Sequence, residues 1–463
     1  MDLDKFLSSL KENIDLLTNQ NRSSEAIFCL EKIHLDSLYL LANQYFAIKE
    51  YKKAKFYFEL LLELNVISFD LYSNLFTTYK FLEDYEKCYE IASKSLTLEG
   101  DEFTKFYNMA TACRATNRLQ QSVDMFYKAV EADPSNVSVL MEKIDCQICM
   151  GEISQKLWDE FQIRWKDVYL APIKQKFHMP EWNGCDIQNK TLLVHSWCGL
   201  GDFILFARFL PLLEKYNCKV LFEIQNSLSP ILEQSYSPNQ IYTKPNSVEG
   251  LFQKPPEADF FICLEEIPRV LKIDSFEKIP IDPYVFHQNK KINFGFDEKK
   301  IKVGLCWCGN YNQSHDWKRS IEFKNLLPFF NISDVEFINL TSHTARIRKA
   351  NNKKIDYFAG LEESDLKRFV INDFGDLIDI MENLDLIITV DTSVCHLAGA
   401  MGKKTWVLLG KDATFFPYTY NKDYSDWYPS VKMFRKKDTW ESLIRQVAQE
   451  LEIFKNEKKS IIL

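Results

Sequence analysis

The chain has 463 residues, a formal net charge of −8 and 46% hydrophobic residues. This length is sufficient for two or three domains with full cores, and the ordinary apolar content argues against a disordered chain. The acidic balance gives no broad positive field for a nucleic-acid backbone, so we expect no nucleic-acid partner. No stretch approaches the roughly 18 apolar residues that would span a bilayer.

The N-terminal residues and the cysteines indicate the cellular compartment of the protein. Residues Met1 to Phe6 include two acids and are not followed by a long apolar run, which does not match a secretory signal peptide. The 12 cysteines are scattered, without the spacing of a disulfide framework. The close pairs 146/149 and 306/308 have no matching second pair, which favours buried thiols over metal ligands. These features predict a cytoplasmic protein without a metal site.

Residues before 150 repeat with a period of 34. Small and aromatic residues recur in register, in the sets Tyr45, Ala54, Phe58, Leu61; Tyr79, Cys88, Ala92, Ser95; and Cys113, Ser122, Phe126, Ala129. This period in paired helices is typical of tetratricopeptide repeats. A plain helical bundle is the alternative, but the in-register repetition argues against it. We therefore predict a repeat domain over residues 1–170 that offers a concave surface to a protein or peptide partner.

Strands, glycine turns and helices alternate after residue 170. A strand over 191–195, a turn with Gly199 and Gly201, a helix over 203–216 and a strand over 219–224 form a βαβ unit. The turn lacks a third glycine, so it is a weak dinucleotide fingerprint. A second series begins near residue 301. The pattern predicts two parallel-sheet domains, 171–296 and 297–463, with a cleft between them.

An apolar run over 384–390 leads directly into Asp391, Thr392 and Ser393, followed by a short helix to Ala400. These are residue types that cap a helix N-terminus. Unpaired backbone N–H groups and the positive end of the helix dipole favour an anion there. A diphosphate would fit this position, and an ordinary capped helix is the alternative interpretation.

Several motifs of the α/β part, spread over about residues 180–450, resemble those of family 9 glycosyltransferases, the heptosyltransferase-like group. The matching segments are Gly199-Leu200-Gly201-Asp202 with residues 206–212, residues 304–310 with Arg319-Ser320-Ile321, residues 373–376, and residues 391–400. The resemblance implies an α + α/β chain in which helical repeats precede a GT-B pair of Rossmann-like domains. It also implies an inverting sugar transfer from a nucleotide diphosphate-sugar, without a metal ion or other cofactor. A helix N-terminus can neutralise a departing diphosphate in place of a metal ion.

Two residues are candidates for the general base that such a transfer needs. Asp202 follows the glycine turn and matches the family's proposed catalytic aspartate. We expect its place at a helix N-terminus to depress its pKa and keep it ionised. His195, at the end of a strand directed toward the cleft, is the competing candidate, since a histidine suits proton transfer near neutral pH. An N-cap acid and a structural histidine remain the alternative interpretations.

Donor binding is assigned mainly to the second α/β domain. Arg319 matches the family arginine that precedes Ser-Ile, and Lys318 is a second candidate for contacting the diphosphate. The other donor-binding candidates are Asp376, Asp391, Thr392, Ser393 and His396, and the substrate-loop candidates are Gly199, Gly201, Gly309 and Asn310. The expected partners are a nucleotide-sugar and a protein or peptide acceptor, with a small saccharide as the alternative acceptor. A non-catalytic repeat scaffold on a degenerate GT-B body is the alternative function.

Overall fold

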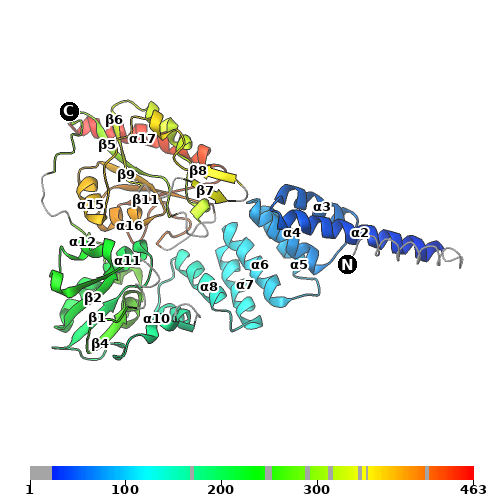
Figure 1. Cartoon of the computed structure of the whole chain (residues 1–463), viewed down its shortest axis with the longest axis horizontal. Helices are drawn as coiled ribbons and strands as arrows, with labels where there is room; N and C mark the ends of the chain where they lie inside the picture. The colour runs from blue at the N-terminus through cyan, green and yellow to red at the C-terminus, as the bar shows by residue number, and fades with distance from the viewer. Residues whose placement is uncertain are drawn as a thin grey trace. The chain divides into compact units, whose positions relative to one another are not determined.

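Packing within the chain divides it into two compact units, Met1–Ser135 and Asn136–Leu463. The structure is a computed structural model that describes residues 23–166, 171–245, 253–286, 292–310, 316–341, 347–350, 353–411 and 417–462 (Figure 1). Among the helices of these ranges, none is both long enough and apolar enough to cross a bilayer.

The first unit is built from successive pairs of helices. They are α2 (Ser23–Ala47), α3 (Tyr51–Glu63), α4 (Phe69–Phe81), α5 (Tyr85–Ser95), α6 (Glu102–Ala115) and α7 (Leu119–Ala132). Ser68 and Asp101 cap α4 and α6 by accepting backbone N–H bonds. Ala54, Cys88 and Ser122, which the 34-residue period aligns, are each at most 1% exposed. Their small size lets the helices approach closely, so the predicted repeats are confirmed.

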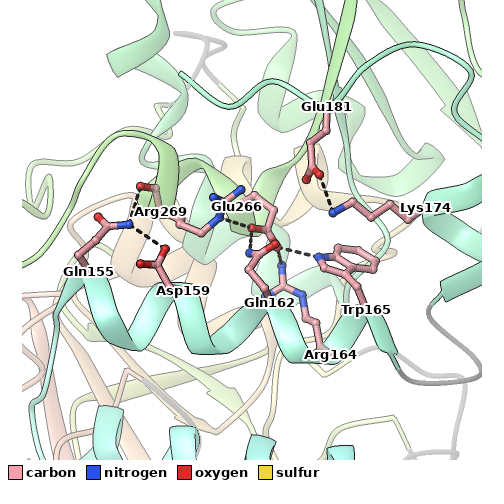
Figure 2. Close-up of polar contacts among 9 residues, drawn as sticks. All are labelled: Gln155, Asp159, Gln162, Arg164, Trp165, Lys174, Glu181, Glu266 and Arg269. Carbon is pink, nitrogen blue, oxygen red and sulfur yellow. Dashed lines mark hydrogen bonds and ion pairs between the residues drawn. The ribbon is translucent and has the colours of Figure 1, made fainter. Parts of the chain in front are cut away.

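A helical arm, residues 137–166 and 171–175, lies at the start of the second unit. It comprises α8 (Val137–Cys149), α9 (Gln155–Glu160), the 3-10 helix η1 (Phe161–Lys166) and α10 (Ala171–Gln175). Trp158 donates its indole N–H to the carbonyl of Ile273 at 2.6 Å, and η1 surrounds the buried Glu266 with donors (Figure 2). Most of the arm falls inside the predicted repeat domain 1–170, yet the arm packs with the α/β part of the chain.

The first α/β region contains a parallel sheet in the order β3-β2-β1-β4. Its strands are β1 (Thr191–His195), β2 (Lys219–Gln225), β3 (Ile241–Lys244) and β4 (Phe260–Cys263), and its helices include α11 (Leu200–Ala207), η2 (Leu210–Tyr216), α12 (Ser229–Leu232), η5 (Leu264–Glu266) and α14 (Ile267–Val270). The single helix predicted over 203–216 is interrupted, because Pro211 lacks the backbone N–H that a continuing α-helix needs.

The second α/β region contains a parallel sheet in the order β11-β10-β9-β5-β6. Its strands are β5 (Ile301–Cys306), β6 (Val335–Asn339), β9 (Leu386–Val390), β10 (Thr405–Leu409) and β11 (Val431–Arg435), and its helices include η7 (Asp316–Lys318), η8 (Phe323–Asn331), α15 (Phe374–Glu382), α16 (Ser393–Ala400) and α17 (Trp440–Ile462). An antiparallel hairpin pairs β7 (Ile347–Ala350) with β8 (Lys353–Asp356). Every residue of β9 and β10 is buried, as their apolar runs indicated. The predicted α + α/β class is confirmed.

We expect Phe126→Ala to destabilise the repeat unit by about 3–5 kcal/mol, because the ring is fully buried and its removal leaves a cavity. Tyr127→Ala, at the next residue, is the matched control. The Tyr127 side chain is 38% exposed, so its loss should lower the free energy of unfolding much less. Hydrogen exchange in α6 and α7 of the full-length protein measures the effect. Equal protection in the two variants would contradict the predicted packing.

Candidate functional site

The N-terminal turns of α11 and α16 meet at Gly201. A Cβ atom on this residue would lie 2.8 Å from Cδ2 of His396 and 3.6 Å from Cα of Ser393. The absence of a side chain therefore permits the contact between the two helices. Figure 1 shows α11 and α16 next to each other between the two sheets. Residues predicted for the base and for the donor are thus brought together from the two α/β regions.

A buried arginine strengthens this contact. Arg208, at the end of α11, is 1% exposed and donates to the backbone carbonyls of Leu205, Pro280 and Trp427. Its guanidinium group also lies 4.4 Å from the ring centre of Tyr428. The Tyr428 hydroxyl lies 3.3 Å from Nδ1 of His396. Arg208 therefore links α11 to Trp427 and Tyr428, the segment that contacts α16 through His396.

Asp202 lies in the first turn of α11 and is half-buried. Burial raises its pKa to about 7, and the negative charges of Glu265 and Asp391 add to the effect. The expectation of a depressed pKa is wrong, because burial and two neighbouring carboxyl groups outweigh the field of the helix N-terminus. A carboxyl group with a pKa near 7 suits general base catalysis at neutral pH.

Arg319 follows η7 in the chain, and its guanidinium group contacts the segment that precedes α16. Its Nη1 donates to the backbone carbonyl of Asp391 at 2.8 Å, and its Nε donates to the fully buried Asp316 at 3.2 Å. A Cβ atom on Gly309 would lie 2.7 Å from Nη2 of Arg319, so this glycine leaves room for the guanidinium group. The arginine is held in place yet keeps 18% of its side chain exposed. It can therefore present a cation beside the N-terminus of α16.

Thr392 is the N-cap residue of α16, but its side chain makes no capping hydrogen bond. The Thr392 hydroxyl instead lies 3.4 Å from that of Thr389 and 3.7 Å from the Cys306 sulfur. Asp391 is 8% exposed, and burial raises its pKa although Arg319 opposes the effect. Burial lowers the pKa of His396 to about 3, assisted by Arg208 and Arg319, so the imidazole is neutral at physiological pH.

His195 lies in a different environment from Asp202. It is fully buried at the end of β1, where its Nδ1 lies 2.6 Å from Oε2 of Glu223. Burial lowers the pKa of His195 to about 4, and the nearby Lys244 acts in the same direction. The structure therefore encloses this histidine in the first sheet instead of exposing it toward a cleft. Glu223 also accepts from Lys176 at 2.8 Å, which completes a buried polar cluster.

The remaining candidates have local contacts. Asp376 accepts hydrogen bonds from the backbone and side chain of Asn372 at the start of α15, and Lys318 lies over the ring of Trp317. Asn310 is exposed at the end of the turn that follows β5. In the described ranges, no group of three or more His, Cys, Asp or Glu side chains could hold a metal ion.

Sequence analysis missed three residues that shape the site: Arg208, Glu265 and Tyr428. Arg208 lies inside a motif that was noted, but its burial depends on partners 72 and 219 residues away. Glu265 follows β4, a short strand that was not predicted. An acid directly after a short apolar run, Phe260 to Leu264, was the available signal.

Comparison with known proteins agrees with the repeat assignment. The tetratricopeptide repeat profile matches residues 35–65 and 106–136, which coincide with the helix pairs described above. The first unit contains tetratricopeptide repeats.

The chain is also 23% identical over 393 residues to Protein FlbA of Caulobacter vibrioides. The match covers 78% of this chain and 63% of FlbA, so the chain spans less than two thirds of that relative.

Two solved glycosyltransferase structures are similar to more than half of this chain. One is the glycosyl transferase family 9 from Veillonella parvula, with 16% identity, a TM-score of 0.37, and coverage of 57% of this chain and 91% of that one. The other is the E. coli ADP-heptose LPS heptosyltransferase II, with 13% identity, a TM-score of 0.40, and coverage of 58% of this chain and 99% of that one.

We expect Gly201→Ala to destabilise the protein by about 1–3 kcal/mol, because the added methyl group would overlap His396 and force α11 away from α16. Gly199→Ala is the matched control in the same turn. Its methyl group would meet only the end of the Asp202 side chain at 3.0 Å, which can rotate. Thermal unfolding of both variants tests the prediction, which a larger loss of stability in Gly199→Ala would contradict.

Proposed function

We propose that the chain is a glycosyltransferase that moves a sugar from a nucleotide diphosphate-sugar to an acceptor hydroxyl. The proposal rests mainly on the contact at Gly201, where the turn that carries Asp202 meets the N-terminus of α16 beside Arg319. In-line displacement of a diphosphate requires a general base close to a helix N-terminus that can bind the anion. The motif resemblance to family 9 glycosyltransferases supports the same reaction class.

The proposed reaction proceeds with inversion at the anomeric carbon. Asp202 takes the proton from the acceptor hydroxyl as its oxygen bonds to the anomeric carbon and the bond to the diphosphate breaks. The N–H groups at the start of α16, together with Arg319, stabilise the charge that develops on the leaving diphosphate. In this scheme these groups take the place of a metal ion. Neutral His396 contributes a ring nitrogen for a hydrogen bond at the same position.

The acceptor is proposed to be a protein or peptide. Tetratricopeptide repeats form concave surfaces that bind extended or helical segments, and the repeats precede the α/β part in the same chain. We propose that they recruit the polypeptide that receives the sugar. A saccharide acceptor would leave the repeats with a role in assembly instead.

Loss of Arg319 should weaken nucleoside diphosphate binding by about tenfold to hundredfold, because a charge-assisted hydrogen bond contributes roughly 1.5–3 kcal/mol. A thermal-shift screen with nucleoside diphosphates and their sugars first identifies the nucleotide. Calorimetry then compares wild type with Arg319→Met and with Thr392→Val/Ser393→Ala. Arg445→Met, an exposed residue of α17 paired with Glu441, is the control. Unchanged affinity in the first two variants would refute the diphosphate site.

Asp202→Asn should abolish transfer while nucleotide binding persists, since only the proton acceptor is lost. In the wild type, kcat should fall as the pH drops below about 7, because burial raises the pKa of Asp202 to about 7 and only the ionised carboxylate acts as a base. A pH profile measured with the donor from the screen checks both statements. Wild-type turnover by Asp202→Asn would remove Asp202 from the mechanism.

A further inference from the structure

A cluster of charged and polar side chains is buried at the carboxyl end of the first sheet, and the proposed reaction does not use it. Glu223 accepts from Lys176 at 2.8 and 3.0 Å and lies 2.6 Å from Nδ1 of His195. Nζ of Lys244 lies 3.4 Å from the same ring nitrogen. Burial of charged groups seldom stabilises a fold on balance, so this cluster calls for another explanation.

Lys244 is the residue of this cluster that contacts the glycine turn, residues 196–201. It is the last residue of β3, an edge strand, yet it is only 1% exposed. Its Nζ donates to the backbone carbonyl of Ser196 at 2.9 Å. Because β2 lies between β3 and β1, the side chain reaches across two strand spacings, about 10 Å, to the end of β1. Only a long side chain can make this contact.

Gln225 makes a second contact with the turn. It is the buried last residue of β2 and pairs with Lys244 in the register of the sheet. Its Nε2 donates to the backbone carbonyl of Cys198 at 3.1 Å. The backbone N–H of Ser196 also donates to the carbonyl of Glu223 at 3.0 Å. These hydrogen bonds from β2 and β3 fix residues 196–198 at the end of the sheet.

The fixed turn leads directly into the residues of the candidate site. Gly199 is the N-cap residue of α11, and its carbonyl accepts from the N–H of Phe203 at 3.0 Å. Oδ2 of Asp202 is folded back over the turn, 3.0 Å from where a Cβ atom of Gly199 would lie. Because α11 begins where the turn ends, a displacement of residues 196–198 would move Asp202 and Gly201 as well.

We propose that Lys244 and Gln225 are positioning residues for Asp202: from the ends of β3 and β2 they hold the turn that carries this carboxyl group. The inference rests on the proposed role of Asp202 as the base. In this role neither side chain exchanges a proton during transfer. A charged donor holds a carbonyl group more firmly than a neutral one, and Glu223 supplies the compensating charge close to the buried ammonium group.

Hydrogen exchange of the full-length protein tests this anchoring without any substrate. Lys244→Met and Gln225→Met approximately keep the length of each side chain but remove its donor. In both variants the amides of residues 196–203 should exchange about tenfold faster, because the turn loses a hydrogen bond. Lys244→Arg retains a charged donor and should stay close to wild type. Exchange in β4 should be unchanged in all three variants.

Lys219→Met is the matched control, since Lys219 is exposed at the opposite end of the same sheet, where β2 begins. It should leave exchange in residues 196–203 unchanged. Unchanged exchange of this segment in both Lys244→Met and Gln225→Met would overturn the proposal. Faster exchange throughout the first sheet would also overturn it, because that result indicates a purely structural role. Gln225→Met keeps the test available if Lys244→Met does not fold.

Activity separates this inference from the proposed function. With the donor found in the nucleotide screen, both methionine variants should lower kcat by about tenfold to hundredfold, since the base is misplaced. Affinity for the nucleoside diphosphate should stay that of wild type, and Lys244→Arg should keep most of kcat. Wild-type kcat in a variant with a loosened turn would overturn the inference. A wild-type protein that binds no nucleoside diphosphate would overturn the proposed function instead, while hydrogen exchange still decides the anchoring.

Discussion

The approach of α11 to α16 is the constraint on which the candidate site depends. Gly201 allows it, since any larger residue would meet the imidazole of His396. Arg208 secures it by donating to carbonyl groups on both sides of the junction. A buried cation can be held by carbonyl oxygens because several well-placed dipoles replace the water it has lost. The contact therefore brings together the N-termini of two helices, α11 and α16, that belong to different α/β regions.

Burial determines the chemistry of this place more than the helix termini do. A helix terminus contributes roughly 0.3–1 kcal/mol to a nearby charge, less than one pKa unit, whereas burial can shift a carboxyl group by several units. The pKa of Asp202 accordingly rises to about 7 and that of His396 falls to about 3, both mainly through burial. An acid that can accept a proton and a neutral imidazole therefore lie near each other at neutral pH.

The helical arm is fixed to the first α/β region through one buried carboxylate. Glu266 accepts donors from η1 and from α14 (Figure 2), and such a desolvated carboxylate is stable only while its donors remain in place. Docking of the arm onto the first α/β region therefore depends on the buried carboxylate of Glu266 in η5.

The sequence determined the elements whose signals are local. The 34-residue period identified the repeats, and the apolar runs identified β1, β5 and β9, because strand burial and helix pairing impose fixed spacings on neighbouring residues. The motifs also located Asp202, Arg319 and the start of α16. Only the tertiary structure decided that Gly201 meets His396, that Glu265 faces the glycine turn, and that His195 is enclosed with Glu223. These facts depend on which distant segments exclude water from a side chain, and no local pattern encodes that exclusion.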